Sequence, residues 1–459
     1  MTRENKDALL ERLREGAELN GSKRLKLAFL LALPAILAQF ASVLMQYIDS
    51  AMVGRLGANP AASIGLVSSS IWILNGFYMA VITGFSVQVA HACGAKNGVR
   101  ARLMLKQGLL CVFLFSVLLS AFALSISGVL PGWLGGDDAI RSDASSYFLI
   151  IAAFLPISAT GLAAASMLQA SGDMKVPSIV YICMGVLDVI FNYVFIYGLG
   201  LGVVGAAWGT CCAESLATLF VIWYVTTQSK ELKSRGEGGS WLPSGTTVKT
   251  AFGITGPLWL QNIVMRGAYV MSTVIVAPLG PVSIAANSFA ITAESFCFMP
   301  GYGLEEASTT LVGQSIGARR KELARSFARI TIGMAVLIMV TLAVIMFAFA
   351  PQLMGIMSID DEVISLGARV LPIVAVVEGF NALAIVGSGV CAGAGQTLVP
   401  TIINFSSMWL VRIVLALILT PVMGLVGYWI AMSVELTVRG IAFAVYLKTG
   451  HWMNKQIPR

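Results

Sequence analysis

The chain has 459 residues, of which 57% are hydrophobic and only 12% are charged. Soluble domains average about 25% charged residues, so this composition excludes a water-soluble protein. The net charge is +7, and most of the basic residues lie in the polar connections between apolar stretches. The excess therefore reflects membrane orientation, and we expect no nucleic-acid partner.

Apolar stretches of 20 or more residues recur along nearly the whole chain. Each is long enough to cross about 30 Å of hydrocarbon as a helix, whereas an open sheet would leave its edge groups unpaired in lipid. The sequence therefore predicts an all-α polytopic membrane protein with twelve transmembrane helices. In the first half the spans lie near 27–51, 62–90, 106–131, 145–170, 177–197 and 203–226. In the second half they lie near 251–277, 283–313, 328–350, 363–393, 400–420 and 424–446.

The two halves carry the same landmarks at a constant offset. Pro34 recurs as Pro257, and Val176-Pro177 recurs as Val399-Pro400, each 223 residues later. In an apolar chain such duplication predicts two pseudo-symmetric six-helix lobes facing each other, an arrangement typical of transporters. We expect an N-terminal segment 1–25, an N-lobe 26–226, an inter-lobe linker 227–250, a C-lobe 251–447 and a tail 448–459.

The basic residues also predict the orientation in the membrane. Of the 30 lysines and arginines, 24 fall in the N-terminal segment, in alternate connections and in the tail. The opposite connections carry the acidic runs Asp137-Asp138 and Asp360-Asp361-Glu362. By the positive-inside rule, both termini then lie in the cytoplasm.

The N-terminal segment has mixed charge and no signal-peptide pattern. Leu9, Leu10 and Leu13 give it one apolar stripe. This stripe predicts a short cytoplasmic surface helix, and the alternative is a disordered tail.

Asp49, Asp188, Asn192 and Thr210 form the most suggestive polar group within the predicted spans. Asp188 and Asn192 are four residues apart and share one helix face, as do Thr210 and Glu214. Ionisable groups in a bilayer are costly and mark functional sites by default. Two carboxylates close together in low dielectric do not both stay ionised, so we expect this group to bind a proton or a small hard cation such as Na⁺. The alternative is that Asp188 and Asn192 only tie helices together by hydrogen bonds.

Polar residues of the second half form another candidate set. Glu294 and Arg266 lie near mid-depth of adjacent spans, which favours a buried ion pair. Alternatively, Glu294 is a cavity carboxylate that attracts a cationic substrate. Glu378 allows the same two interpretations, and we place it with Asn381 and Gln39 among the candidate substrate-cavity residues.

Three further ionisable residues fit structural roles. We expect Arg412 to neutralise one of the acids of the second half. Glu214 and Glu435 occupy roughly corresponding positions in the two halves, which favours a shared structural role. The sequence shows no nucleophile–base pattern, phosphate-cradling loop or metal-ligand spacing. We therefore expect a protein that is not an enzyme and has no cofactor, with transport driven by an ion gradient or by another protein.

Several segments resemble the MATE family (multidrug and toxic compound extrusion), which belongs to a larger group that includes lipid flippases. They are YIDSAMVGRLG around Asp49, TTLVGQSIGAR at 309–319, and the paired connections GDMKVP and GQTLVP. The resemblance implies two six-helix lobes around a V-shaped cavity and alternating access. It also implies export of organic, often aromatic cations in exchange for H⁺ or Na⁺ across the bacterial inner membrane. We expect a monomer, and the alternative function is a lipid or lipid-linked-oligosaccharide flippase.

The resemblance also assigns residues. Asp49 takes the place of the family's aspartate in the first span, and Asp188, Asn192 and Thr210 take polar cation-site positions in the fifth and sixth spans. Many relatives carry Asn before the acid in the fifth span, whereas here the acid comes first. Some relatives carry further acids where this chain has Met265 and Asn381, so a C-lobe ion site of that type is not expected. Glu294 matches an acid of other bacterial members.

Overall fold

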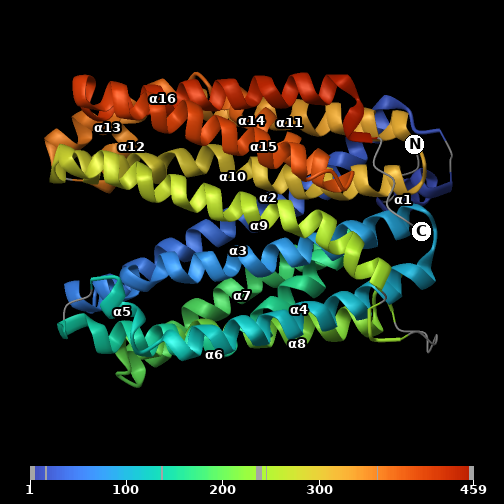
Figure 1. The fold of residues 1–459 in the computed structure, drawn as a ribbon, viewed down its shortest axis with the longest axis horizontal. Helices are drawn as coiled ribbons and strands as arrows, with labels where there is room; N and C mark the ends of the chain where they lie inside the picture. The colour runs from blue at the N-terminus through green and yellow to red at the C-terminus, as the bar shows by residue number, and fades with distance from the viewer. Residues whose placement is uncertain are drawn as a thin grey trace. The chain divides into compact units, whose positions relative to one another are not determined.

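The computed structural model describes residues 6–15, 18–135, 138–233, 240–243, 245–358 and 360–453. Parts of the predicted linker and tail lie outside these ranges, as does Asp137 of the acidic run Asp137-Asp138. Within them, every regular element is a helix, as the sequence predicted (Figure 1).

The helices of the first half are α1 (Lys6–Glu15), α2 (Gly21–Gly54), α3 (Ala58–Gly94), α4 (Gly98–Ile126), α5 (Leu130–Trp133), α6 (Asp138–Ala170), α7 (Lys175–Tyr193), the π-helix η1 (Val194–Gly198) and α8 (Gly202–Thr227). Those of the second half are α9 (Gly245–Val276), η2 (Ala277–Leu279), α10 (Pro281–Gly317), α11 (Lys321–Ala348), α12 (Ala350–Met357), α13 (Asp361–Ala375), α14 (Glu378–Gly393), α15 (Leu398–Ser406), the π-helix η3 (Ser407–Ile413), α16 (Val414–Thr449) and η4 (His451–Met453).

The sequence repeat is confirmed by the elements themselves. Helices α3, α4, α6 and α7 begin 223 residues before α10, α11, α13 and α15. The turns repeat as well. Gly57 and Gly280 precede α3 and α10 with φ of 120° and 89°, a conformation that glycine adopts without steric cost. Lys96 and Arg319 follow the same helices in the left-handed region, with φ of 54° and 59°.

The number of membrane spans follows from helix length and from two breaks. In the described residues, ten helices are long and apolar enough to cross a membrane, and the pair α13–α14, bent by 60°, makes eleven. One of the ten, Leu398–Thr449, has 52 residues. At about 1.5 Å per residue it is more than twice as long as the bilayer core is thick. It turns at Gly424, where φ is 62° and ψ is −143°, so it forms two spans. The count of twelve agrees with the prediction.

Two compact units divide the described chain. We call Leu37–Thr255 the N-unit, and the residues up to Ile36 together with those from Gly256 onward the C-unit. Both boundaries fall inside long helices, α2 and α9, close to Pro34 and Pro257. A proline inside a helix removes one hydrogen bond and bends the helix. The domain limits predicted at the linker stay a prediction.

In the N-unit, α6 packs against α3, α4 and α8, and α7 packs against α8. Helix α4 shows how composition decides which face is buried. Val112 and Ser116 face the bundle, whereas Leu114, Leu118 and Phe122, four residues apart, are exposed. An exposed apolar stripe of this length on a hydrophobic helix faces lipid. Small residues on the inner face let neighbouring helices approach closely.

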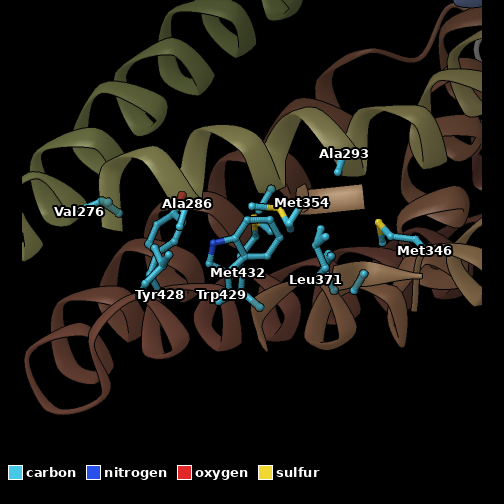
Figure 2. Close-up of a cluster of buried hydrophobic side chains, with 14 of the residues drawn as sticks. Val276, Ala286, Ala293, Met346, Met354, Leu371, Tyr428, Trp429 and Met432 are labelled. Atoms are coloured by element: carbon cyan, nitrogen blue, oxygen red, sulfur yellow. The ribbon is translucent and has the colours of Figure 1, made fainter. Parts of the chain in front are cut away.

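The core of the C-unit contains a cluster of large side chains (Figure 2). Trp429 and Met432 of α16 lie beside Met354 of α12 and Leu371 of α13. The indole Nε1 of Trp429 donates to Oδ1 of Asn287 on α10 over 3.0 Å. A buried indole N–H needs such a partner, so this bond fixes α16 against α10.

The N-terminal helix α1 packs on protein. Leu9 and Leu13 are 0% exposed and Leu10 is 4% exposed. The Arg14 guanidinium donates to Oε1 of Gln314 on α10 over 3.2 Å, and Arg320 donates to the carbonyl of Leu13 over 3.3 Å. The prediction of a helix is therefore confirmed. Its apolar stripe is buried, and two hydrogen bonds near its C-terminal end join the helix to Gln314 and Arg320 of the C-unit.

Replacing Leu13 with alanine should lower the stability of the protein by about 2–5 kcal/mol, because the cavity left behind adds to the lost burial. Thermal unfolding in detergent measures the change. Glu11→Ala on the exposed face of α1 is the matched control and should have little effect. Equal melting temperatures for the two variants would show that α1 does not dock on the bundle in solution.

Candidate functional site

A close contact between α2 and α7 positions the two aspartates of the N-unit. A Cβ built on Gly185 of α7 would lie 1.8 Å from Sδ of Met45 on α2, so only glycine permits this approach. Asp49 lies one turn after Met45, and Asp188 lies about one turn after Gly185. The two carboxyl groups are therefore brought together just beyond the point of closest contact.

Asp49, Asp188, Asn192 and Thr210 lie together in one group, which we call the carboxylate site. The amide Nδ2 of Asn192 donates to Oδ1 of Asp49 over 3.1 Å. The carboxyl groups of Asp49 and Asp188 are close enough to interact with each other, and Asp188 also interacts with the Thr210 hydroxyl. Two ionised carboxylates this close in a low-dielectric bundle repel each other, which a bound proton or cation relieves.

The carboxylate site is buried and has unused acceptors. Asp188 and Asn192 are each 2% exposed, and Asp49 is half-buried. Oδ1 of Asp188 and Oδ1 of Asn192 have no hydrogen-bond partner among the described residues. Buried polar atoms are normally satisfied, so these two oxygens favour a bound proton or cation. The atoms of this site that could bind an ion are all oxygens, which suits a hard cation.

Glycine also allows α8 to approach the carboxylate site. A Cβ on Gly209 would lie 2.0 Å from Oδ1 of Asn192 and 2.9 Å from its backbone nitrogen. Gly209→Ala should therefore displace Asn192 and cost about 1–3 kcal/mol of stability, as overpacking does. Thermal unfolding measures this cost. Gly65→Ala on α3, where a Cβ meets nothing within 4 Å, is the control, and equal stability of the two variants would contradict the close packing.

The candidate cavity residues of the C-unit lie near a helix break. Glu378 is 0% exposed and sits in the first turn of α14, directly after the bend that separates it from α13. Nδ2 of Asn381 donates to its Oε2 over 3.3 Å, while its Oε1 has no hydrogen-bond partner among the described residues. Glu294 of α10 is 6% exposed and close enough to Glu378 to interact electrostatically. Gln39 is partly exposed on α2 and belongs to the N-unit.

Arginines balance part of this acidic group. Nη2 of Arg412 lies 2.8 Å from Oε2 of Glu435, and Nε of Arg439 lies 3.1 Å from its Oε1. The expectation that Arg412 neutralises an acid of this half is confirmed, and the acid is Glu435. The same two arginines also act electrostatically on Glu294.

The shared role predicted for Glu214 and Glu435 is wrong. Glu435 is 0% exposed and paired with two arginines. Glu214 of α8 instead accepts a hydrogen bond from Ser158 of α6, and no ion pair to it is found among the described residues. Roughly matching positions in a repeat do not guarantee matching partners, because Arg412 and Arg439 have no basic counterparts at 189 and 216, where the sequence has Val and Leu.

Tyr147 was not among the predicted site residues. It lies on α6 and is close enough to interact electrostatically with Asp49, Asp188 and Glu214. No spacing in the sequence separates it from the other tyrosines, because its place depends on how α6 is rotated against α7 and α8.

Comparisons with known proteins cover nearly the whole chain. The sequence profile of the MatE family matches residues 34–194 and 257–418, two segments separated by the repeat offset. The "Probable multidrug resistance protein NorM" of Thermotoga maritima is 27% identical over 435 residues, 93% of each chain. The "Multidrug resistance protein MdtK" of Yersinia enterocolitica is 26% identical over 443 residues, 93% of this chain and 95% of its own. The crystal structure of the Vibrio cholerae MATE transporter VcmN in the bent form superposes with a TM-score of 0.86 at 20% identity, covering 95% of this chain and 99% of that one.

Proposed function

Because the chain belongs to the MatE family, we propose that it is a multidrug efflux antiporter, which exports organic cations by alternating access in exchange for H⁺ or Na⁺. Relatives that match more than nine-tenths of the chain are named as multidrug resistance proteins. The chain is a multi-pass membrane protein, and its bacterial relatives support the inner membrane as its location. The alternative of a lipid or oligosaccharide flippase is not favoured, since none of these names points to it.

One observation carries the coupling part of the proposal. The carboxylate site joins two acids, an amide and a hydroxyl in a buried place, and it leaves two acceptor oxygens unused among the described residues. Such a group binds and releases a proton or a hard cation at moderate cost, because the bound ion neutralises a carboxylate charge that a low-dielectric environment disfavours. The ion binds between Asp49 on α2 and Asp188 on α7. Its arrival and departure therefore change how these two helices are held together.

This coupling gives a mechanism for exchange. When the ion enters from outside and binds at Asp49 and Asp188, it draws α2 and α7 together and repacks the N-unit, which releases the substrate. When the ion leaves on the cytoplasmic side, the carboxylates repel each other, and the helices return. A ligand shifts such an equilibrium only by its differential affinity for the two states, and here that difference comes from carboxylate repulsion.

Substrate binding is assigned to acids and amides. Glu294 and Glu378 supply carboxyl groups in the C-unit, and Asn381 and Gln39 supply amide groups. An aromatic cation is attracted by a buried carboxylate that its own charge then balances. The pattern of basic residues supports cytoplasmic termini, and we propose that the protein acts as a monomer.

Purified protein in vesicles tests the function. The probe is ethidium, a fluorescent aromatic cation, and its movement is followed under a pH gradient alone, a sodium gradient alone and no gradient. Antiport predicts that ethidium moves in the direction opposite to the flow of one of the two ions, and that ion is the coupling ion. If neither gradient moves ethidium or other organic cations, while a labelled lipid is translocated, the flippase alternative replaces the proposal.

A further inference from the structure

Glu214 is an acid of the N-unit whose charge is not balanced by a base in the described part of the chain. Its rough counterpart in the repeat, Glu435, forms ion pairs with Arg412 and Arg439. Among the described residues, the side-chain bond of Glu214 is with the Ser158 hydroxyl. An acid in a hydrophobic bundle with no cation beside it is held most cheaply in its neutral, protonated form.

The Glu214 side chain opens onto a pocket within the N-unit. The pocket has about 490 Å³ of space not filled by atoms and lies between α6, α7 and α8. Its polar lining comes from Glu214, Ser158, Thr218, Tyr181 of α7 and Tyr78 of α3. From Glu214 it follows α8 as far as Val221, about two turns toward the C-terminal end of that helix. Glu214 is thus partly accessible from this pocket, which hydroxyl groups also line.

Ser158 can hold Glu214 in either protonation state. Its Oγ lies within hydrogen-bonding distance of the Glu214 carboxyl and also 3.3 Å from the carbonyl oxygen of Phe154. A serine hydroxyl has one hydrogen to donate and two lone pairs to accept with. When Glu214 is ionised, Ser158 donates to it. When Glu214 is protonated, the Ser158 hydroxyl donates to the Phe154 carbonyl and accepts a hydrogen bond from the carboxylic acid O–H of Glu214.

The pocket is connected to the carboxylate site. Glu214 lies one turn after Thr210 on α8, a rise of about 6 Å, and interacts electrostatically with Asp188 of α7. Other titratable groups interact electrostatically with it, namely Tyr78 of α3, Tyr147 of α6 and Cys211 of its own helix, and Tyr181 of α7 lines the same pocket. All of these groups are neutral or acidic, and Tyr147 also reaches Asp49 and Asp188. The acids therefore form a connected series from the carboxylate site to the pocket.

We infer that Glu214 is a second proton-binding site, which takes the proton from the carboxylate site and passes it through the pocket toward the C-terminal end of α8. The inference rests on the proposed function and specifies its coupling ion as H⁺. In the first step the proton leaves the Asp188 carboxyl, directly or through the Tyr147 hydroxyl, and the Glu214 carboxylate accepts it. In the second step the proton leaves Glu214 for water on that side, and Glu214 is again ionised.

Glu214→Gln tests the relay, because glutamine keeps the hydrogen bond with Ser158 but binds no proton. In vesicles, ethidium transport driven by a pH gradient should fall on the order of 100-fold, the lower range of what a positioned proton-transfer group contributes. Exchange of ethidium for ethidium without a gradient needs no net proton movement and should stay close to wild type. Glu214→Asp should recover part of the driven transport, and Asp138→Asn, at an exposed acid of the same unit, is the control.

Three results would overturn the inference. Driven transport by Glu214→Gln at the wild-type rate shows that the proton does not pass through Glu214. If Glu214→Gln stays folded but loses both ethidium exchange and driven transport, Glu214 lies in the substrate path. Wild-type transport driven by sodium and indifferent to pH assigns the coupling to Na⁺.

A spectroscopic test is independent of transport. Infrared difference spectra of the wild type between high and low pH should contain the carbonyl stretching band of a protonated carboxylic acid. One component should be missing in Glu214→Gln and present in Asp49→Asn. The loss of this component in Glu214→Gln does not depend on whether the protein transports any drug. The test therefore distinguishes failure of the proposed function from failure of the proton site. An unchanged band in Glu214→Gln removes the site.

Discussion

Gradient-driven export is expected to fall to background when Asp49 is replaced by asparagine. Asparagine keeps the size of the side chain and can still bond with Asn192, which lies 3.1 Å from Asp49 in the wild type. It removes one of the two interacting carboxyl groups. A single remaining carboxyl group, Asp188, no longer experiences the carboxylate repulsion that makes ion binding favourable. The measurement is ethidium export from drug-sensitised cells and from vesicles.

The control for Asp49→Asn is Asp138→Asn, which neutralises an acid that is 95% exposed. It should export like the wild type at equal expression. Asp188→Asn should lose export to the same degree as Asp49→Asn, and the double variant should be no worse than either one, because the two acids act as a unit. Full export by Asp49→Asn would remove the coupling role of the carboxylate site.

Most of the fold could be predicted because lipid restricts the choices. Hydropathy and the 223-residue offset predicted all twelve spans, since each span needs about 20 apolar residues and the backbone must be satisfied within helices. The break between α13 and α14 was not predicted, although Pro372 lies just before it. Its repeat counterpart α6 contains Pro156 and stays continuous. A proline alone therefore does not decide whether a span breaks, because packing around it also contributes.

The composition of the carboxylate site was predicted more fully than its surroundings. Asp49, Asp188, Asn192 and Thr210 stand out in the sequence because polar groups in apolar spans are rare, and the structure brings all four together. The contributions of Gly185 and Gly209 were missed, since glycines are common in membrane helices. Only the three-dimensional structure shows that a Cβ at either position would collide with Met45 or Asn192.

The acids and arginines of the C-unit can be understood by counting charges. Arg412 and Arg439 bring two positive charges, and Glu435 supplies one negative charge between them. Glu294, on which both arginines act, can balance the second. Glu378, buried beside Glu294 and bonded to Asn381, then has no cation left among the described residues of this cluster and favours the neutral state or a bound organic cation. Removing Glu435 would leave both arginines with a single counter-charge.

Glu435→Gln should therefore destabilise the protein strongly, by about 3–5 kcal/mol, because it removes one partner of a buried ion pair and leaves uncompensated charge. Chemical unfolding in detergent micelles measures the loss. Glu435→Gln combined with Arg412→Met should be more stable than Glu435→Gln alone, since replacing a buried pair with apolar side chains costs much less than breaking it. The exposed pair of Glu322 and Arg325, whose oxygen and nitrogen lie 3.2 Å apart on α11, is the control. Glu322→Gln should change stability by less than about 1 kcal/mol. If Glu435→Gln is equally mild, water reaches the arginines and the cluster is not a buried structural element.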